Sequence, residues 1–183
     1  KFAESFNIPV ALTWGAADLI PFDHDLYVGT FGTHGNRHAN FAVQNADLII
    51  SLGSRLDTKS TGSPINTFAR AARKIMVDID INELNKFQYF DLKFDQLIHC
   101  DLRDFFNNFS KLEPAEDTIN NLEWLKQINK WKHQFISFDD TKSITTTQVN
   151  PYSFVDSISS NLKGTEQIFI DTGCSIAWFM QSL

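Results

Sequence analysis

The segment Gly29–Gly35 (GTFGTHG) is rich in glycine and polar residues, a composition that suits anion binding. The segment holds three glycines, and a helix containing Asn40 is expected directly after it. Glycines let the backbone come close to a ligand, and the N–H groups of a first helical turn attract an anion. A loop with only a structural role is an equal alternative, because the pattern is neither GxGxxG nor a Walker A motif.

A second candidate segment, Gly53–Asp57 (GSRLD), directly follows an apolar run. Gly53 permits a tight turn, and the planar guanidinium of Arg55 can bind a phosphate through two parallel hydrogen bonds. A surface contact between Arg55 and Asp57 is the alternative. The segment therefore predicts either a phosphate contact or a local ion pair.

Carboxylates follow two further apolar runs. An acid at a strand end can accept hydrogen bonds from ribose hydroxyls, and we expect Asp78 to face a ligand in this way. Asp80 is expected to cap the next helix, with Glu83 completing a capping box. Asp101 follows the other run, where capping of a helix at 102–106 is an equal alternative.

Several other kinds of chemistry find little support. His34 and His38 lie four residues apart without a third ligand nearby, which argues against zinc. The sequence contains no G-x-S-x-G motif, which argues against a serine hydrolase. The formal net charge of −6 argues against a nucleic-acid partner, and no apolar run approaches the roughly 20 residues of a membrane helix. Cys100 and Cys174 form no CxxC pair, which favours a reducing, cytoplasmic location.

Apolar runs alternate with helical patterns over the first 111 residues. Strands are predicted at 9–14, 47–52, 74–79 and 96–99, and helices at 37–45, 64–72 and 82–86. This alternation is typical of βαβ units. We therefore predict an α/β fold with a doubly wound parallel sheet, whose strand ends would carry the candidate residues.

The pattern changes after residue 111. A polar stretch, an amphipathic helix at 122–134 and a Ser/Thr-rich linker at 137–150 are expected. Pro151 then begins a new helix, followed by a strand at 167–171, a turn at Gly173 and a helix at 175–183. We predict a central domain at 1–111, a helix and linker at 112–149, and the truncated start of a second α/β domain at 150–183, because about 34 residues cannot close their own core.

The order of these motifs resembles the central domain of thiamine-diphosphate enzymes of the acetolactate synthase type. The pattern G-x-x-G-x-H-G-x-x-x-A-N-x-A-V-x-x-A-D-L-x-I-x-x-G-x-R-x-D, followed by D-I-D and N-K, is matched in register and order. The matching residues are Gly29, Gly32, His34, Gly35, Ala39, Asn40, Ala42, Val43, Ala46, Asp47, Leu48, Ile50, Gly53, Arg55, Asp57, Asp78, Asp80, Asn85 and Lys86.

The tail resembles the opening of that family's diphosphate-binding domain, where a strand ends in Asp-x-Gly. The resemblance implies that Gly173, Cys174 and Ser175 contact thiamine diphosphate. Acetolactate synthases usually carry Gly-Gln-His at this place, so the tail is more similar to a divergent carboligase subgroup.

The resemblance implies a Rossmann-like central domain that binds the ADP half of FAD. The implied contacts are His34, Gly35, Asn40, Gly53, Ser54, Arg55, Asp78 and Asp101. Many relatives keep this domain without FAD, so a purely structural domain is an equal alternative. The resemblance places the first strand of the domain before Lys1, the catalytic Glu in a domain upstream, and the magnesium motif after Leu183.

The full-length enzyme is therefore expected to use thiamine diphosphate and Mg²⁺ on a 2-keto acid, as a carboligase or decarboxylase, and to form a homodimer or homotetramer. The chain alone is expected to be inactive. The alternative is a non-catalytic adenine-nucleotide-binding or structural module. A sirtuin-like deacylase lacks support, because its pair of CxxC motifs is absent.

Overall fold

The computed structural model describes residues 1–109, 111, 121–135 and 148–182. The strands are β1 (Val10–Leu12), β2 (Tyr27–Thr30), β3 (Leu48–Leu52), β4 (Arg73–Asp78) and β5 (Gln96–His99). The α-helices are α1 (Phe2–Ser5), α2 (Arg37–Asn45), α3 (Thr58–Thr61), α4 (Ile81–Asn85), α5 (Leu102–Phe109), α6 (Leu122–Gln134), α7 (Pro151–Asn161) and α8 (Cys174–Ser182). Short 3₁₀ helices are η1 (Trp14–Ala16), η2 (Ile65–Thr67) and η3 (Lys86–Tyr89).

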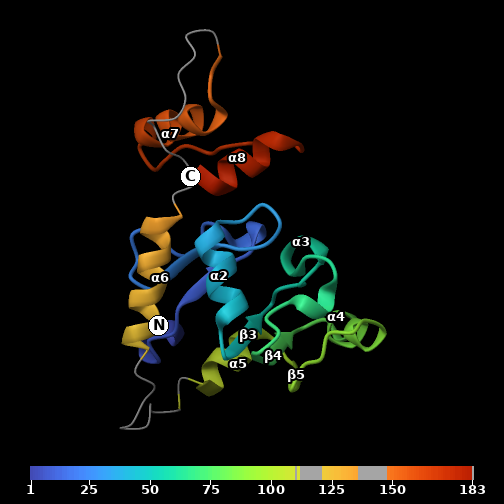
Figure 1. The fold of residues 1–183 in the computed structure, drawn as a ribbon. Helices are drawn as coiled ribbons and strands as arrows, with labels where there is room; N and C mark the ends of the chain where they lie inside the picture. Colours follow the sequence, from blue (N-terminus) through green and yellow to red (C-terminus); the bar gives the residue numbers. More distant parts are fainter. Residues whose placement is uncertain (110, 112–120, 136–147, 183) are drawn as a thin grey trace.

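The predicted α/β class is confirmed, because in the described residues the strands pair in parallel and helices flank them (Figure 1). The strands divide between two sheets, β1-β2 and β3-β4-β5. Parallel pairing places the carboxyl ends of all strands in one sheet along the same edge. That edge is where an α/β protein positions ligand-binding loops.

Two local predictions about strands are wrong. β2 was not predicted, and its last two residues, Gly29 and Thr30, were expected in the glycine-rich loop, although all four of its residues are buried. Residues 167–171 form no strand, and Phe169 there is 89% exposed. A strand needs a partner for its backbone groups, and no strand in the described part of the chain pairs with this segment.

The helix predicted at 64–72 is also wrong, since only the turn η2 forms there. Pro64 is extended, and Ala69 has a φ of 42° that a right-handed helix cannot contain. The backbone N–H of Ala69 donates instead to the side chain of Gln44 on α2, at 3.1 Å. A contact from another helix thus replaces the local helical bond.

A single apolar cluster joins both sheets. It includes Val28 of β2, Met76 of β4, Phe68, and Ala39 of α2, all at most 2% exposed. Ile128 of α6 also belongs to it, with Trp124 and Trp131 packed alongside. Helix α6 therefore packs on the same core as the strands, although it follows the central domain in the sequence.

Helices α7 and α8 lie together beyond α2 and α6, at the upper end of the molecule in Figure 1. The predicted start at Pro151 is confirmed, because Asn150 caps α7 by accepting from the N–H groups of Tyr152 and Ser153. The linker predicted at 137–150 lies mostly outside the described residues. No helix in the described ranges is long and apolar enough to span a membrane.

Candidate functional site

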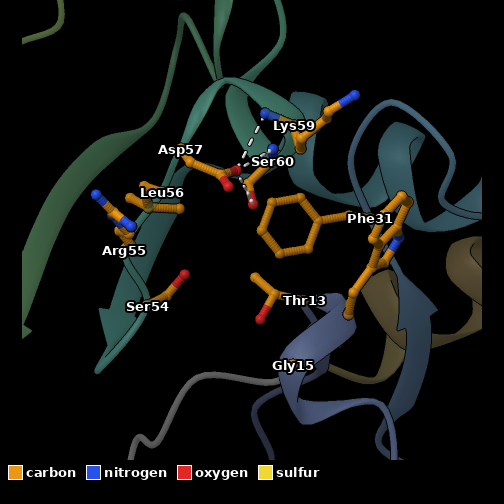
Figure 2. A pocket seen from close by; sticks show the side chains of 10 residues that line it. Thr13, Gly15, Phe31, Ser54, Arg55, Leu56, Asp57, Lys59 and Ser60 are labelled. Carbon is orange, nitrogen blue, oxygen red and sulfur yellow. Dashed lines mark hydrogen bonds between the residues drawn. The ribbon is translucent and has the colours of Figure 1, made fainter. Parts of the chain in front are cut away.

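A pocket of about 340 Å³ opens where the carboxyl ends of β1, β2 and β3 meet. Thr13, Trp14 and Gly15 follow β1, Phe31 follows β2, and the segment from Ser54 to Ser60 follows β3. The remaining lining residues in that segment are Arg55, Leu56, Asp57 and Lys59. Figure 2 shows Arg55, Leu56 and Asp57 on one side, Thr13 and Gly15 on the other, and the Phe31 ring between them. Ligands of α/β proteins usually bind at the carboxyl ends of parallel strands, and the pocket lies at such ends.

The turn after β3 bends sharply around the pocket. Gly53 donates its backbone N–H to the carbonyl of Val77 on β4 at 2.8 Å, which ends the strand pairing. Leu56 adopts a φ of 46°, in the left-handed region that leucine rarely occupies, and its side chain is 3% exposed. Such strain is found where the surrounding structure fixes a loop for a function. Beside it, the Oγ of Ser54 is buried without a hydrogen-bond partner among the described residues.

Asp57 closes this turn by capping α3. Its Oδ1 accepts from the backbone N–H groups of Lys59 and Ser60, both at 3.0 Å, and from the Ser60 hydroxyl at 3.2 Å (Figure 2). The predicted alternative of an Arg55–Asp57 contact is therefore wrong. The carboxylate is committed to the start of α3 and stabilises the helix that lines the pocket.

Arg55 pairs instead with a residue of α4. Its Nε lies 3.0 Å from Oε1 of Glu83, and Oε2 of Glu83 lies 2.6 Å from Nζ of Lys86. Lys86 also donates to the backbone oxygen of Arg55. Although its side chain is 77% exposed, Arg55 is thus held at the rim of the pocket by two residues from one helix and the turn that follows it.

The glycine-rich loop folds back onto the end of β2. A Cβ on Gly35 would lie 2.5 Å from the Thr30 carbonyl oxygen, so no side chain fits there. His34 stacks on Trp14 at 5.4 Å between ring centroids. Asn40 supports the loop from α2, because its side chain exchanges two hydrogen bonds with the backbone of Gly32. Of the contacts predicted in this region, His34, Gly35 and Asn40 do not line the pocket, but His34 stacks on Trp14, which does.

The predicted strand-end acids lie outside the pocket. Asp78 is 8% exposed, and its Oδ1 accepts the backbone N–H of Asp80 at 2.9 Å. Asp80 caps α4 as predicted, accepting from Asn82 at 2.8 Å. The capping box is wrong, since Glu83 pairs with basic side chains instead. Asp101 accepts the N–H of Arg103 at 2.7 Å, which favours the capping alternative.

The candidate diphosphate turn is separate from this pocket. Gly173 has a φ of 134°, strained for any other residue, and leads directly into α8. The Oδ1 of Asp171 accepts the N–H of Thr172 at 2.7 Å, and the Ser175 hydroxyl donates to the Asp171 carbonyl at 3.0 Å. Cys174 and the turn are exposed. The N-terminus of α8, which follows this turn, is therefore exposed to solvent.

No metal centre emerges among the described residues, where no three His, Cys, Asp or Glu side chains group together. His38 lies near the backbone of Val28 on β2 and of Phe135, and near the charge of Lys132 on α6. Burial, and secondarily the positive charge of Lys132, lowers the pKa of His38 to about 4. The two histidines thus lie in different surroundings, His34 against the Trp14 ring and His38 in a half-buried position.

Ser54 and Arg55 were predicted from the sequence, whereas the residues on the other side of the pocket were not. Thr13, Trp14 and Gly15 escaped because the strand was predicted to continue to Trp14, whereas β1 ends at Leu12. Phe31 was not identified as a residue that follows a strand, because β2 was not predicted. Had the ends of β1 and β2 been predicted correctly, both segments would have been candidates, because ligands bind at the carboxyl ends of parallel strands.

Residues 1–107 match the family model described as thiamine pyrophosphate enzyme, central domain. The chain belongs to the thiamine pyrophosphate enzymes. Its resemblance to the acetolactate synthase type is confirmed by the relatives that follow.

Curated relatives carry the name acetolactate synthase large subunit. The chain is 33% identical over 135 residues to the protein of Cyanidium caldarium. The aligned region is 74% of this chain and 23% of the Cyanidium caldarium protein. It is 31% identical over 182 residues to the Lactococcus lactis protein, covering 98% and 30%. A probable acetolactate synthase large subunit of Methanocaldococcus jannaschii is 32% identical over 185 residues, covering 97% and 30%. The chain thus spans less than a third of the length of these relatives.

Proposed function

We propose that the full-length protein is a thiamine-diphosphate-dependent enzyme acting on 2-keto acids, as a carboligase or decarboxylase, and that this chain carries its nucleotide-binding part. The observation that carries the proposal is the pocket at the carboxyl ends of β1, β2 and β3. The names of the relatives support the substrate class. In this division, residues 1–111 form the central domain, 112–149 connect, and 150–183 begin the cofactor-binding domain.

The chemistry of the pocket suits an adenine nucleotide such as the ADP part of FAD. The rings of Trp14 and Phe31 supply apolar surface for a flat base. Arg55 and Lys59 supply positive charge at the rim, and the unpartnered Ser54 hydroxyl supplies a hydrogen-bond donor. This combination of an apolar lining with a few polar groups is typical of cofactor sites.

The charges around the pocket favour an anion. Arg55, Lys59 and Lys86 contribute three positive charges, whereas Asp57 and Glu83 contribute two negative ones, which leaves one positive charge. Asp57 is further engaged by backbone N–H groups. Because ligand pockets usually measure roughly 300 to 1,000 Å³, a pocket of about 340 Å³ suits one part of a dinucleotide. The remainder would extend along the glycine-rich loop, beside His34 and Gly35.

The turn at Asp171–Ser175 fits the diphosphate of thiamine diphosphate. The space beside Gly173 is open, because a Cβ built there would meet nothing within 4 Å, and α8 begins directly after it. Backbone N–H groups at such a helix start attract phosphate oxygens. When bound, the cofactor supplies the carbon chemistry on the 2-keto acid. The residues of this chain bind and orient its diphosphate, and the ligands of Mg²⁺ are expected elsewhere in the protein.

A non-catalytic module that binds an adenine nucleotide is the second candidate, supported by the same pocket. Turnover of a 2-keto acid by the full-length protein separates the two. The enzyme needs thiamine diphosphate and Mg²⁺ for turnover, whereas a binding module retains nucleotide and turns over nothing. We further propose a homodimer or homotetramer in the cytoplasm, where the free thiols of Cys100 and Cys174 are stable.

The direct test of the nucleotide site is the absorbance spectrum and released-nucleotide content of the purified full-length protein. A flavin spectrum, or ADP released on denaturation, supports the proposal. Protein that carries no nucleotide and takes up neither FAD nor ADP contradicts the nucleotide site and leaves a structural central domain.

A further inference from the structure

Asn36 has an unusual role for a residue at the start of a helix. It is the N-cap of α2, yet its side chain caps no N–H group there. Its Oδ1 instead accepts the backbone N–H of Thr30 at 2.9 Å and lies 3.2 Å from the Thr30 hydroxyl. Since asparagine is among the best N-cap residues, forgoing the cap indicates that this side chain is needed elsewhere.

The two residues reach across to α8. The Thr30 hydroxyl lies 3.1 Å from the carbonyl oxygen of Met180, and Asn36 Nδ2 lies 3.5 Å from that of Gln181. The single Thr30 hydroxyl proton is shared between Met180 and Asn36. Thr30 is 3% exposed, so this contact is shielded from water. We name Thr30 and Asn36 together the loop clamp.

The contacts join two segments that lie far apart in the sequence. Met180 and Gln181 lie near the last described residue of α8, whereas Thr30 ends β2 and Asn36 precedes α2. The other end of the same helix follows the turn at Gly173. Nine residues at 1.5 Å each make α8 a rod of about 13 Å, so fixing its C-terminal end also fixes the turn.

We propose that the loop clamp positions the thiamine-diphosphate turn by holding α8 on the glycine-rich loop of the central domain. Thr30 and Asn36 are positioning residues that act through α8 and touch no cofactor themselves. They also link this turn to the pocket, because Phe31, next to Thr30, lines it. The inference rests on the proposed function, in which Gly173–Ser175 bind the cofactor diphosphate.

The test uses the full-length protein with single substitutions that remove one donor each. Thr30→Val keeps the shape of the side chain and removes the hydroxyl. Asn36→Asp keeps the oxygen that accepts from Thr30 and removes the Nδ2 donor. Thr30→Ser restores the hydroxyl. Thr33→Val is the matched control, because the Thr33 hydroxyl in the same loop donates to the Lys59 carbonyl rather than to α8.

Two measurements are made on every variant. The dissociation constant of thiamine diphosphate is obtained by titration with the cofactor in the presence of Mg²⁺. Hydrogen exchange of the backbone amides of α8 is followed without cofactor, as a readout independent of activity. The loss of one hydrogen bond of about 1 kcal/mol corresponds to roughly a fivefold change.

We expect Thr30→Val and Asn36→Asp to weaken thiamine-diphosphate binding about fivefold and to speed exchange in α8 by a similar factor. Thr30→Ser and Thr33→Val should behave like the wild type. Unchanged binding and exchange in the first two variants would overturn the inference alone, and so would an equal change in Thr33→Val. A wild-type protein that does not bind thiamine diphosphate would overturn the proposed function itself.

Discussion

The Nε of Arg55 lies 3.0 Å from Oε1 of Glu83, which joins the turn after β3 to helix α4. Lys86 binds the other carboxylate oxygen of Glu83 at 2.6 Å and also the backbone oxygen of Arg55. These contacts restrict an exposed guanidinium to the rim of the pocket. A positioned cation loses less conformational entropy when it binds a phosphate, so the pair supports a role for Arg55 in ligand binding.

Replacing Arg55 with Gln should therefore weaken nucleotide binding by the full-length protein. The variant loses a charge-assisted hydrogen bond, for which we expect a five- to tenfold higher dissociation constant, about 1–1.4 kcal/mol. Titration with FAD and ADP measures the change. The matched control is Lys126→Gln, which removes an exposed ion pair with Glu123 on α6. Equal affinity of both variants for nucleotide would argue against a contact at Arg55.

Replacing Asp57 with Ala should destabilise the helix that lines the pocket. The side chain of Asp57 caps the N–H groups of Lys59 and Ser60, and loss of such a cap costs about 1 kcal/mol. Urea unfolding should show this loss, together with weaker nucleotide binding. Asp57→Asn retains an accepting oxygen and should lose much less stability. A stability of Asp57→Ala equal to that of the wild type would contradict the capping role.

The longer regular elements could be predicted from the sequence because their patterns are local. The apolar runs of β3 and β4 and the helical spacing of α6 each reflect burial along one element. β2 could not be recognised in the same way, because it has only four residues and includes Gly29. In place of the helix expected at 64–72, the backbone N–H of Ala69 donates a tertiary hydrogen bond to the side-chain oxygen of Gln44.

The candidate site was predictable only in part, for a related reason. Ser54 and Arg55 follow a strand that the sequence reveals, and both line the pocket. The partnership of Arg55 with Glu83 depends on how α4 lies against the turn after β3, which no local spacing encodes. Asp78 and Asp101 follow strands too, but neighbouring backbone N–H groups engage their carboxylates.

Acid should destabilise the protein through His38. Its folded-state pKa is about 4, below the ordinary value of 6.5, because burial and the nearby Lys132 disfavour the charged ring. The unfolded chain takes up a proton below pH 6.5, whereas the folded protein resists it until about pH 4. The stability that His38 contributes above pH 6.5 is therefore lost as the pH falls from 6.5 to 4.

Thermal unfolding between pH 4 and pH 7.5 measures this effect. His38→Gln removes the titrating group and should flatten the dependence of the midpoint on pH. His133→Gln, a replacement at an exposed position on α6, should keep the wild-type dependence. An identical pH dependence of His38→Gln and the wild type would show that other groups dominate the acid response.

Helix α6 should be part of the cooperative unit formed by the two sheets. Ile128 is 2% exposed and lies in the shared core, so Ile128→Ala should cost about 2–5 kcal/mol. Leu122→Ala on the same helix removes a side chain that is 55% exposed and should cost far less. Urea unfolding distinguishes the two. A small loss in Ile128→Ala would mean that α6 is not held by this core.

The central claim is that the pocket at the ends of β1, β2 and β3 binds an adenine nucleotide. Its most direct measurement is isothermal titration of the nucleotide-stripped full-length protein with ADP and FAD, for the wild type and Ser54→Ala. We expect saturable binding at one site per chain, and weaker binding when the Ser54 hydroxyl, which has no partner among the described residues, is removed. The absence of any binding of either nucleotide to the wild type would contradict it.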